Sequence, residues 1–299
     1  MTTAAATKKT LLQRLEGLRQ IPTIPVVLAP LLRYLQRPVE QLDVQKVTDL
    51  IAQDKSLTAQ CLQMANSPLF GRAQNVQSIR GAVISLGFRH VSDIAMSCGV
   101  LNLLPTAKST LDPVVFWEHA LGCALVCRHL ARKINFSDPG KAYLAGLLHD
   151  LGIIVNLWVL PKEFGVAWEI AKAEGIPLHE AEQRSLGFTH CDSGRMLAER
   201  WDLSPDLIDV VTWHHSPDKA TVHPELVGLV QLADLLCRMS GLNHGYVEDR
   251  QVNLIEEVGF HVLAQHSPAL KEFDWARLTF ELDSYLDEVH NLVRTIYRK

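Results

Sequence analysis

The chain has 299 residues, of which 47% are apolar and 21% are charged, and its formal net charge is −4. This composition is typical of a globular protein with its own core, and it excludes a largely disordered chain. The acidic balance also argues against a broadly basic nucleic-acid binder, although it leaves a local basic patch open. The unusual feature is the number of histidines, 13. The functional interpretation depends on whether these histidines lie close together in the fold.

The sequence shows no targeting or membrane segment. Residues 1–10 are not followed by the apolar run of a secretory signal, and no apolar stretch reaches the ~18 residues of a membrane span. The six cysteines form no Cys-x-x-Cys pair, and most lie in apolar helical stretches, where a free thiol packs as a small apolar group. We therefore expect a cytoplasmic protein with reduced cysteines.

Helical spacing recurs along the whole chain, whereas sustained strand-like alternation is hard to find. In the first part, the pattern predicts helices near residues 8–20, 25–36, 44–53, 57–66, 78–86 and 89–103. Further on, an N-cap residue precedes a proline at Asp112-Pro113, Asp138-Pro139 and Ser204-Pro205. Residues 241–251 are expected to form a loop and residues 274–299 a long amphipathic helix. These features predict an all-α fold.

A polar, turn-rich stretch at residues 104–112 separates two helical regions. We expect an N-terminal tail at 1–14, an N-terminal helical part at 15–111 and a second helical part at 112–299. The two helical parts are expected to form one integrated unit.

Five histidines and two aspartates recur on helical segments of the second part: His119, His149, Asp150, His190, His214, His215 and Asp234. Asp150 and Asp234 are flanked by apolar residues, so each is expected to face inward, where a carboxylate needs a partner such as a metal ion. Imidazole and carboxylate suit divalent iron, manganese, cobalt, nickel or zinc, and seven donors suit a pair of ions bridged by one carboxylate. Any one of these histidines alone could equally cap a helix or pack in the core.

The order H…HD…H…HH…D resembles the HD superfamily of metal-dependent phosphohydrolases, and it is similar to the binuclear subset that includes the HD-GYP cyclic-di-GMP phosphodiesterases. The resemblance covers about residues 112–240. It implies one divalent ion held by His119, His149, Asp150 and Asp234. It implies a second ion, bridged by Asp150 and held by His190, His214 and His215. Asp150 would then be the central catalytic residue, and the two ions would be Fe, Mn, Ni or Zn.

Two positions depart from the HD-GYP pattern. Those enzymes carry a lysine three residues after the His-Asp pair, where this chain has Ile153, and their Gly-Tyr-Pro segment is missing. Some also carry a glutamate one turn before the first histidine, where this chain has Val115, so a third metal is not expected. These departures leave open whether the site is catalytically active.

The first part resembles the HDOD domain, the HD-related output domain. Four blocks typical of that family recur in order, at residues 21–25 (IPTIP), 47–58 (VTDLIAQDKSLT), 62–71 (LQMANSPLFG) and 76–87 (VQSIRGAVISLG). With the HD-like half, the resemblance covers about residues 15–285. It implies a multi-helix, HD-superfamily-like fold with an N-terminal helical subdomain, and a bacterial signalling module.

Three functions remain open. One is a signal-transduction module that binds signalling proteins or a small nucleotide-like ligand and carries a binuclear metal site. The alternative is a metal-dependent phosphohydrolase acting on a nucleotide or cyclic dinucleotide, and the third is a metal or redox sensor. Residues 78–97 favour a packed α-hairpin over a DNA-reading helix-turn-helix, so nucleic acid is not an expected partner. The other eight histidines, including His90, His129, His223 and His290, are expected to be surface or packing residues.

Overall fold

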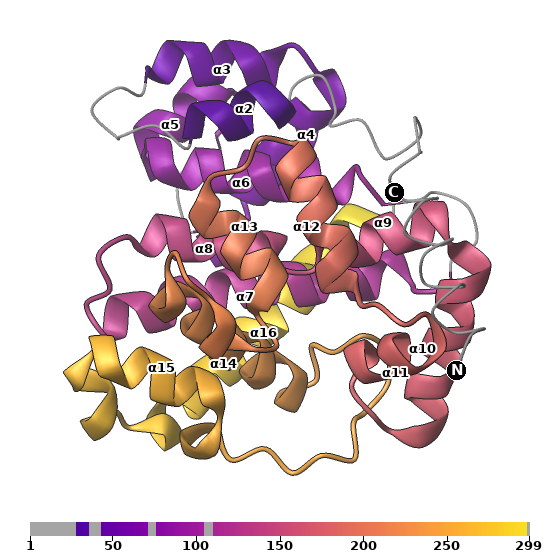
Figure 1. Ribbon diagram of the computed structural model, residues 1–299. Helices are drawn as coiled ribbons and strands as arrows, with labels where there is room; N and C mark the ends of the chain where they lie inside the picture. Colours follow the sequence, from indigo (N-terminus) through magenta and orange to yellow (C-terminus); the bar gives the residue numbers. More distant parts are fainter. Residues whose placement is uncertain (1–27, 36–42, 71–75, 105–109, 298–299) are drawn as a thin grey trace. The chain divides into compact units, whose positions relative to one another are not determined.

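The computed structural model describes residues 28–35, 43–70, 76–104 and 110–297 (Figure 1). Every regular element in these ranges is a helix, which confirms the predicted all-α fold. The contacts divide the chain into two compact units, one comprising residues 24–103 and 274–299 and the other including residues 104–273. The predicted tail at 1–14, the helix near 8–20 and the block at 21–25 lie outside the described residues.

The smaller unit contains the described helices of the first part of the chain. They are α2 (Leu28–Leu35), α3 (Val44–Ala52), α4 (Lys55–Ala65), the 3-10 turn η2 (Pro68–Phe70), α5 (Ile79–Leu86) and α6 (Phe88–Leu101). Asp43, Asp54 and Ser78 each accept a backbone N–H in the first turn of the helix that follows, so side-chain caps fix three of the helix starts. Buried Ile51, Met64 and Ile94 contribute to the core of this unit.

The C-terminal helix α16 (Trp275–Tyr297) also belongs to the smaller unit. It contacts α4 and η2, and the Gln63 side chain donates a hydrogen bond to the Thr295 carbonyl at 3.3 Å. The sequence predicted this helix but grouped it with residues 112–299, because periodicity within a helix carries no information about which distant helices it will contact.

The larger unit contains the second helical series. Its helices are α7 (Pro113–Lys133), α8 (Pro139–Leu148), α9 (Leu151–Val159), α10 (Pro161–Glu174), α11 (Leu178–Ser185), α12 (His190–Arg200), α13 (Pro205–Trp213), α14 (Pro224–Met239) and α15 (Val258–His266). Three 3-10 turns accompany them, η3 (Pro217–Lys219), η4 (Leu254–Glu256) and η5 (Pro268–Glu272). Helix α7 packs against α8 and α14, and α9 packs against α12.

The predicted N-cap residues and the prolines that follow them explain where these helices begin. Asp112 and Asp138 cap α7 and α8 by accepting backbone N–H groups at 2.9–3.1 Å. Ser204 precedes Pro205 at the start of α13 but makes no side-chain cap. Within the described residues, Pro139–Val159, which runs through α8 and α9, is the one stretch long and apolar enough to cross a membrane, and 89% of its most apolar 18-residue window is buried inside the fold. It therefore serves as core.

An ion pair between Lys141 of α8 and Asp206 in the first turn of α13 makes the stability of the larger unit pH-dependent. Burial opposes ionisation of Asp206, but the hydrogen bond from Lys141 outweighs it, so the pKa of this carboxyl is lowered. Because the folded-state pKa lies below the unfolded-state pKa, the stabilisation is present above the unfolded value, about 3.9, and is lost as pH falls through the folded value.

We therefore expect Asp206→Asn to lower the free energy of unfolding by about 1 kcal/mol at pH 7, an amount reduced by solvent screening of the half-exposed Lys141. The difference from the wild type should shrink as pH falls below about 4. Urea unfolding of both proteins across this pH range measures it, with exposed Asp218→Asn as the control. A difference that stays constant with pH would contradict the role given to Asp206.

Candidate metal centre

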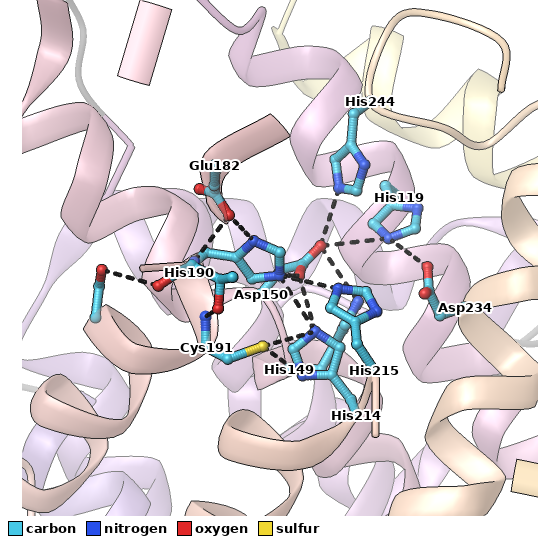
Figure 2. Close-up of polar contacts among 12 residues, drawn as sticks. His119, His149, Asp150, Glu182, His190, Cys191, His214, His215, Asp234 and His244 are labelled. Carbon is cyan, nitrogen blue, oxygen red and sulfur yellow. Dashed lines mark hydrogen bonds and ion pairs between the residues drawn. The ribbon is translucent and has the colours of Figure 1, made fainter. Parts of the chain in front are cut away.

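The structure brings all seven predicted site residues together inside the larger unit (Figure 2). They come from α7 (His119), the break between α8 and α9 (His149 and Asp150), the start of α12 (His190), the end of α13 (His214 and His215) and α14 (Asp234). Six of the seven are buried, and the exception, His215, is partly exposed. Residues spread over more than a hundred positions of sequence thus form one cluster.

Asp150 lies at the centre of this cluster, with imidazole nitrogens on both carboxylate oxygens. Its Oδ2 lies 3.5 Å from His119 Nε2 and 3.2 Å from His149 Nε2. Its Oδ1 lies 3.3 Å from His190 Nε2 and 3.5 Å from His214 Nε2. A carboxylate that faces two separate sets of donors has the geometry of a bridging ligand.

Asp234 offers one oxygen to the cluster and uses the other to hold its own position. Its Oδ2 accepts a hydrogen bond from Arg238 at 2.8 Å, and Arg238 in turn pairs with Glu248 at 2.6 Å. Its Oδ1 is buried without a hydrogen-bond donor and lies 3.4 Å from His119 Nε2. A buried carboxylate oxygen without a donor is costly unless a cation is bound there.

Hydrogen bonds to backbone carbonyls orient three of the imidazole rings. The Nδ1 atoms of His119, His149 and His214 lie 2.7, 2.8 and 3.1 Å from the carbonyl oxygens of residues 242, 146 and 210. Since a carbonyl can only accept, Nδ1 must carry the hydrogen. In the neutral ring, Nε2 then presents its lone pair toward Asp150, as a metal ligand requires.

His190 is held by a buried carboxylate that the sequence prediction missed. Glu182 of α11 accepts from His190 Nδ1 at 2.6 Å and from the His190 backbone N–H at 2.8 Å. It also accepts from the Asn156 amide at 3.0 Å. A carboxylate behind a ligating imidazole fixes the tautomer and raises its basicity, so Glu182 is a positioning residue for His190.

The spacing of the nitrogens fits a metal ion. His190 Nε2 lies 3.1 Å from His215 Nε2 and 3.3 Å from His214 Nε2. Two nitrogens that each lie 2.0–2.1 Å from one ion, at angles of 90–109°, are separated by about 2.8–3.4 Å. Facing lone pairs at this distance repel each other unless a cation or a proton lies between them, and the residues present therefore fit a metal.

The charges of the cluster favour a cation as well. Burial opposes a charge on His119, but Asp150 and Asp234 raise the pKa of this imidazole to about 10. Burial also opposes ionisation of Asp150, but the imidazoles of His149, His119 and His214 hold the pKa of its carboxyl well below its usual range. The two carboxylates thus favour positive charge at His119, and an ion bound there would displace that proton.

Two histidines without a predicted role also contact the centre. His244 lies beside Asp150, so its assignment as a surface or packing residue is wrong, whereas His179 packs against a site residue as expected. His244 Nε2 lies 2.9 Å from Asp150 Oδ2, and its ring centroid is 4.4 Å from that of His119. The His179 ring stacks on His215 with centroids 4.0 Å apart. Both lie outside the H…HD…H…HH…D order, and the position of His244 in a loop of polar and glycine residues gave no periodic signal.

A cavity of about 530 Å³ adjoins the centre where His215 is partly exposed. Cys191 and Trp213 line it, together with the basic side chains Arg184, Arg195 and Lys219. Burial raises the pKa of the Cys191 thiol, but the imidazoles of His214 and His190 outweigh this effect and lower it to about 6. Position 153, where the HD-GYP pattern has a lysine, is a fully buried isoleucine.

Comparison with known proteins agrees with the resemblance to the HDOD domain. A family model described as the HDOD domain matches residues 21–217. The crystal structure of an HDOD domain protein of unknown function from Geobacter sulfurreducens is 29% identical, with a TM-score of 0.84, and the match covers 98% of this chain and 99% of that one.

Two further proteins are similar over different lengths. The solved structure of a protein from Marinobacter aquaeolei VT8, provisionally named a signal transduction protein, has the same fold, with 21% identity, a TM-score of 0.75 and coverage of 99% of this chain and 67% of that one. An uncharacterised protein of Treponema pallidum is 28% identical over 73% of this chain. The chain spans 43% of the length of that curated relative.

Proposed function

Because the chain belongs to the HDOD domain family, we propose that it is a signal-transduction module that binds two divalent metal ions at Asp150. One observation carries the metal site: imidazole Nε2 atoms face both oxygens of a single buried carboxylate at the separations of ligands around an ion. The signalling role is supported by the resemblance to HDOD modules and by the name of the Marinobacter relative.

The residues divide into two sets, one on each side of Asp150. One ion would lie among His119, His149, Asp234 and Asp150 Oδ2. The other would lie among His190, His214, His215 and Asp150 Oδ1. Imidazole and carboxylate donors suit Fe, Mn, Ni or Zn.

The cavity beside His215 supports a phosphate-containing, nucleotide-like ligand. Trp213 offers an aromatic surface, and Lys219 Nζ lies 5.7 Å from the centroid of its ring. Arg184 and Arg195 now pair with Glu174 and Glu199 on the exposed surface, at 2.7 and 2.8 Å, and such exposed pairs are weak enough to be exchanged for a phosphate. A ligand bound here would contact the cavity side of the metal centre.

Metal analysis combined with ligand binding tests this function. Purified protein reconstituted with Mn²⁺, Fe²⁺, Ni²⁺ or Zn²⁺ should retain two ions per chain after dialysis, and it should bind cyclic di-GMP more tightly than metal-free protein does. If the protein retains none of the four metals, the proposed metal site is wrong. Retained metal with no effect on nucleotide binding would leave a structural metal site and refute the nucleotide-like ligand.

A second function, metal-dependent hydrolysis of a phosphodiester, is favoured by the open cavity at His215. When bound, two ions can activate water and stabilise the charge of a phosphoryl group in displacement. Here Asp150 would hold both ions and His215 would face the ligand. The buried Ile153 argues against it, because no cation comes from that position. Turnover of cyclic di-GMP by reconstituted protein, absent from Asp150→Asn, would make this the primary function.

Glu182 gives a further test of the site. We expect Glu182→Gln to weaken metal binding by about 10–100-fold, because the amide lacks the negative charge that raises the basicity of His190. Its NH₂ group also cannot accept the hydrogen bond that Asn156 donates to the second carboxylate oxygen. Titration of metal-free protein with Zn²⁺ in competition with a chelator measures this change. Exposed Glu180→Gln on the same helix is the matched control, and equal affinities for both variants would contradict the role of Glu182.

A further inference from the structure

The loop that follows α14 places a third imidazole on the Asp234 side of the centre. His244 is 7% exposed, and its Nε2 lies 2.9 Å from the same Asp150 Oδ2 that faces His119 and His149. The donor atoms of His119, Asp150 and His244 all lie within 4.8 Å of one another. The ring therefore occupies the position of a ligand, although it is not in the family's His-Asp order.

The loop is fixed by contacts on both sides of His244. The Leu242 carbonyl accepts the His119 Nδ1 hydrogen at 2.7 Å, so the loop is tied to another histidine of the same set. The Trp168 indole donates to the His244 carbonyl at 3.4 Å, and the Tyr246 hydroxyl donates to the Ile176 carbonyl at 3.0 Å. These contacts position the His244 ring before any ion binds.

The two sides of Asp150 consequently differ in the number of donors and in access. Counting His244, the Asp234 side has five imidazole and carboxylate donors, His119, His149, His244, Asp150 Oδ2 and Asp234 Oδ1, all from buried residues. They form two overlapping clusters that share His119, and the buried Cys123 belongs to the cluster with His149 and Asp234. The other side has four such donors, His190, His214, His215 and Asp150 Oδ1, and the Cys191 sulfur lies within 4.8 Å of the three imidazole donors. His215 and Cys191 are partly exposed and line the cavity. Structural metal sites are closed by protein ligands, whereas reactive sites keep a position open.

We infer that His244 is a fifth protein ligand that closes the ion on the Asp234 side, so that only the ion beside His215 is open to water and ligands. This inference rests on the proposed metal centre. It makes the pair asymmetric, with one ion that is held for structure and one that exchanges.

Release of Zn²⁺ to a chromophoric chelator tests the asymmetry in the wild-type protein without any substitution. After loading with Zn²⁺ alone, we expect two phases of similar amplitude, with the slow phase at least about 10-fold slower than the fast one. A single phase that releases both ions would overturn the inference while leaving the metal centre intact. Protein that takes up no Zn²⁺ would overturn both.

Substitutions then assign the slow phase. His244→Ala should accelerate the slow phase by at least about 10-fold and leave the fast phase unchanged, and His215→Ala should change only the fast phase. His244→Gln keeps a hydrogen-bonding side chain beside Asp150, so it should remain folded and show the same acceleration. His261→Ala removes an exposed histidine from α15 and should match the wild type. A slow phase preserved in both His244 variants would overturn the assignment.

Discussion

Replacing Asp150 with asparagine is expected to remove both metal ions from the protein. The side chain keeps its size, but the amide loses the negative charge and cannot present two anionic oxygens to imidazoles on opposite sides. Affinity for Zn²⁺ should fall by more than the ~10–100-fold expected for an outer-sphere partner, on both sides of the centre at once. Metal content per chain after dialysis, measured by mass spectrometry, should fall to near zero.

The controls for this variant separate loss of ligand from loss of fold. Asp283→Asn changes an exposed aspartate of α16, in the other unit, and should retain the wild-type metal content. The helical signal of the metal-free Asp150→Asn protein should equal that of the metal-free wild type. If Asp150→Asn still retains a full complement of metal, Asp150 does not bridge and the centre must be interpreted differently.

Replacing Gly152 with alanine is expected to produce the largest loss of stability. Gly152 lies in the first turn of α9, where a Cβ would be 1.7 Å from the His190 carbonyl oxygen and 2.7 Å from the Gly194 backbone nitrogen of α12. Both obstacles are backbone atoms, so no side-chain rotation can relieve them, and α9 and α12 must separate. We expect the free energy of unfolding to fall by more than about 3 kcal/mol, together with weaker metal binding, because His190 moves with α12.

Gly165→Ala is the matched control for this effect. Gly165 lies inside α10, where the nearest atom to a Cβ would be the Thr110 hydroxyl at 3.2 Å, a side chain that can move. Since alanine favours a helix over glycine by up to about 1 kcal/mol, this variant should be as stable as the wild type or more so. Urea unfolding of the three proteins compares them, and a Gly152→Ala protein within 1 kcal/mol of the wild type, about the measurement's resolving power, would show that the helices can separate at little cost.

The sequence predicted the helices well because their ends are set locally. Asp43, Asp54, Asp112 and Asp138 cap helices through bonds to residues two or three positions away, and such signals can be identified without knowledge of the tertiary fold. The grouping of α16 with the smaller unit was not predictable in this way. It depends on contacts such as Gln63 with Thr295, which are 232 residues apart in the sequence.

The same distinction applies to the residues of the candidate metal centre, some of which could be predicted from the sequence and some not. Its seven predicted residues follow a recognisable order, and adjacent pairs such as His149-Asp150 mark it. His244 is 94 residues from Asp150 and lies in a loop, where no periodicity predicts which side chain points inward. Glu182 is one of three acidic residues between 174 and 182, and only packing against Asn156 and His190 distinguishes it from exposed Glu180.

Helix α14 and the loop after it lie beyond residue 217, where the match to the family model ends. A fragment cut at that residue would keep all four donors on the cavity side of Asp150, yet it would lack Asp234, His244 and the carbonyl that orients His119. The end of the family match thus cuts through the Asp234 side of the centre, since His119 and His149 lie before it and Asp234 and His244 lie after it. A relative could lose the buried ion through changes in this segment alone and still match the domain in full. Residues equivalent to Asp234 and His244, rather than membership of the family, would distinguish relatives with two ions from relatives with one.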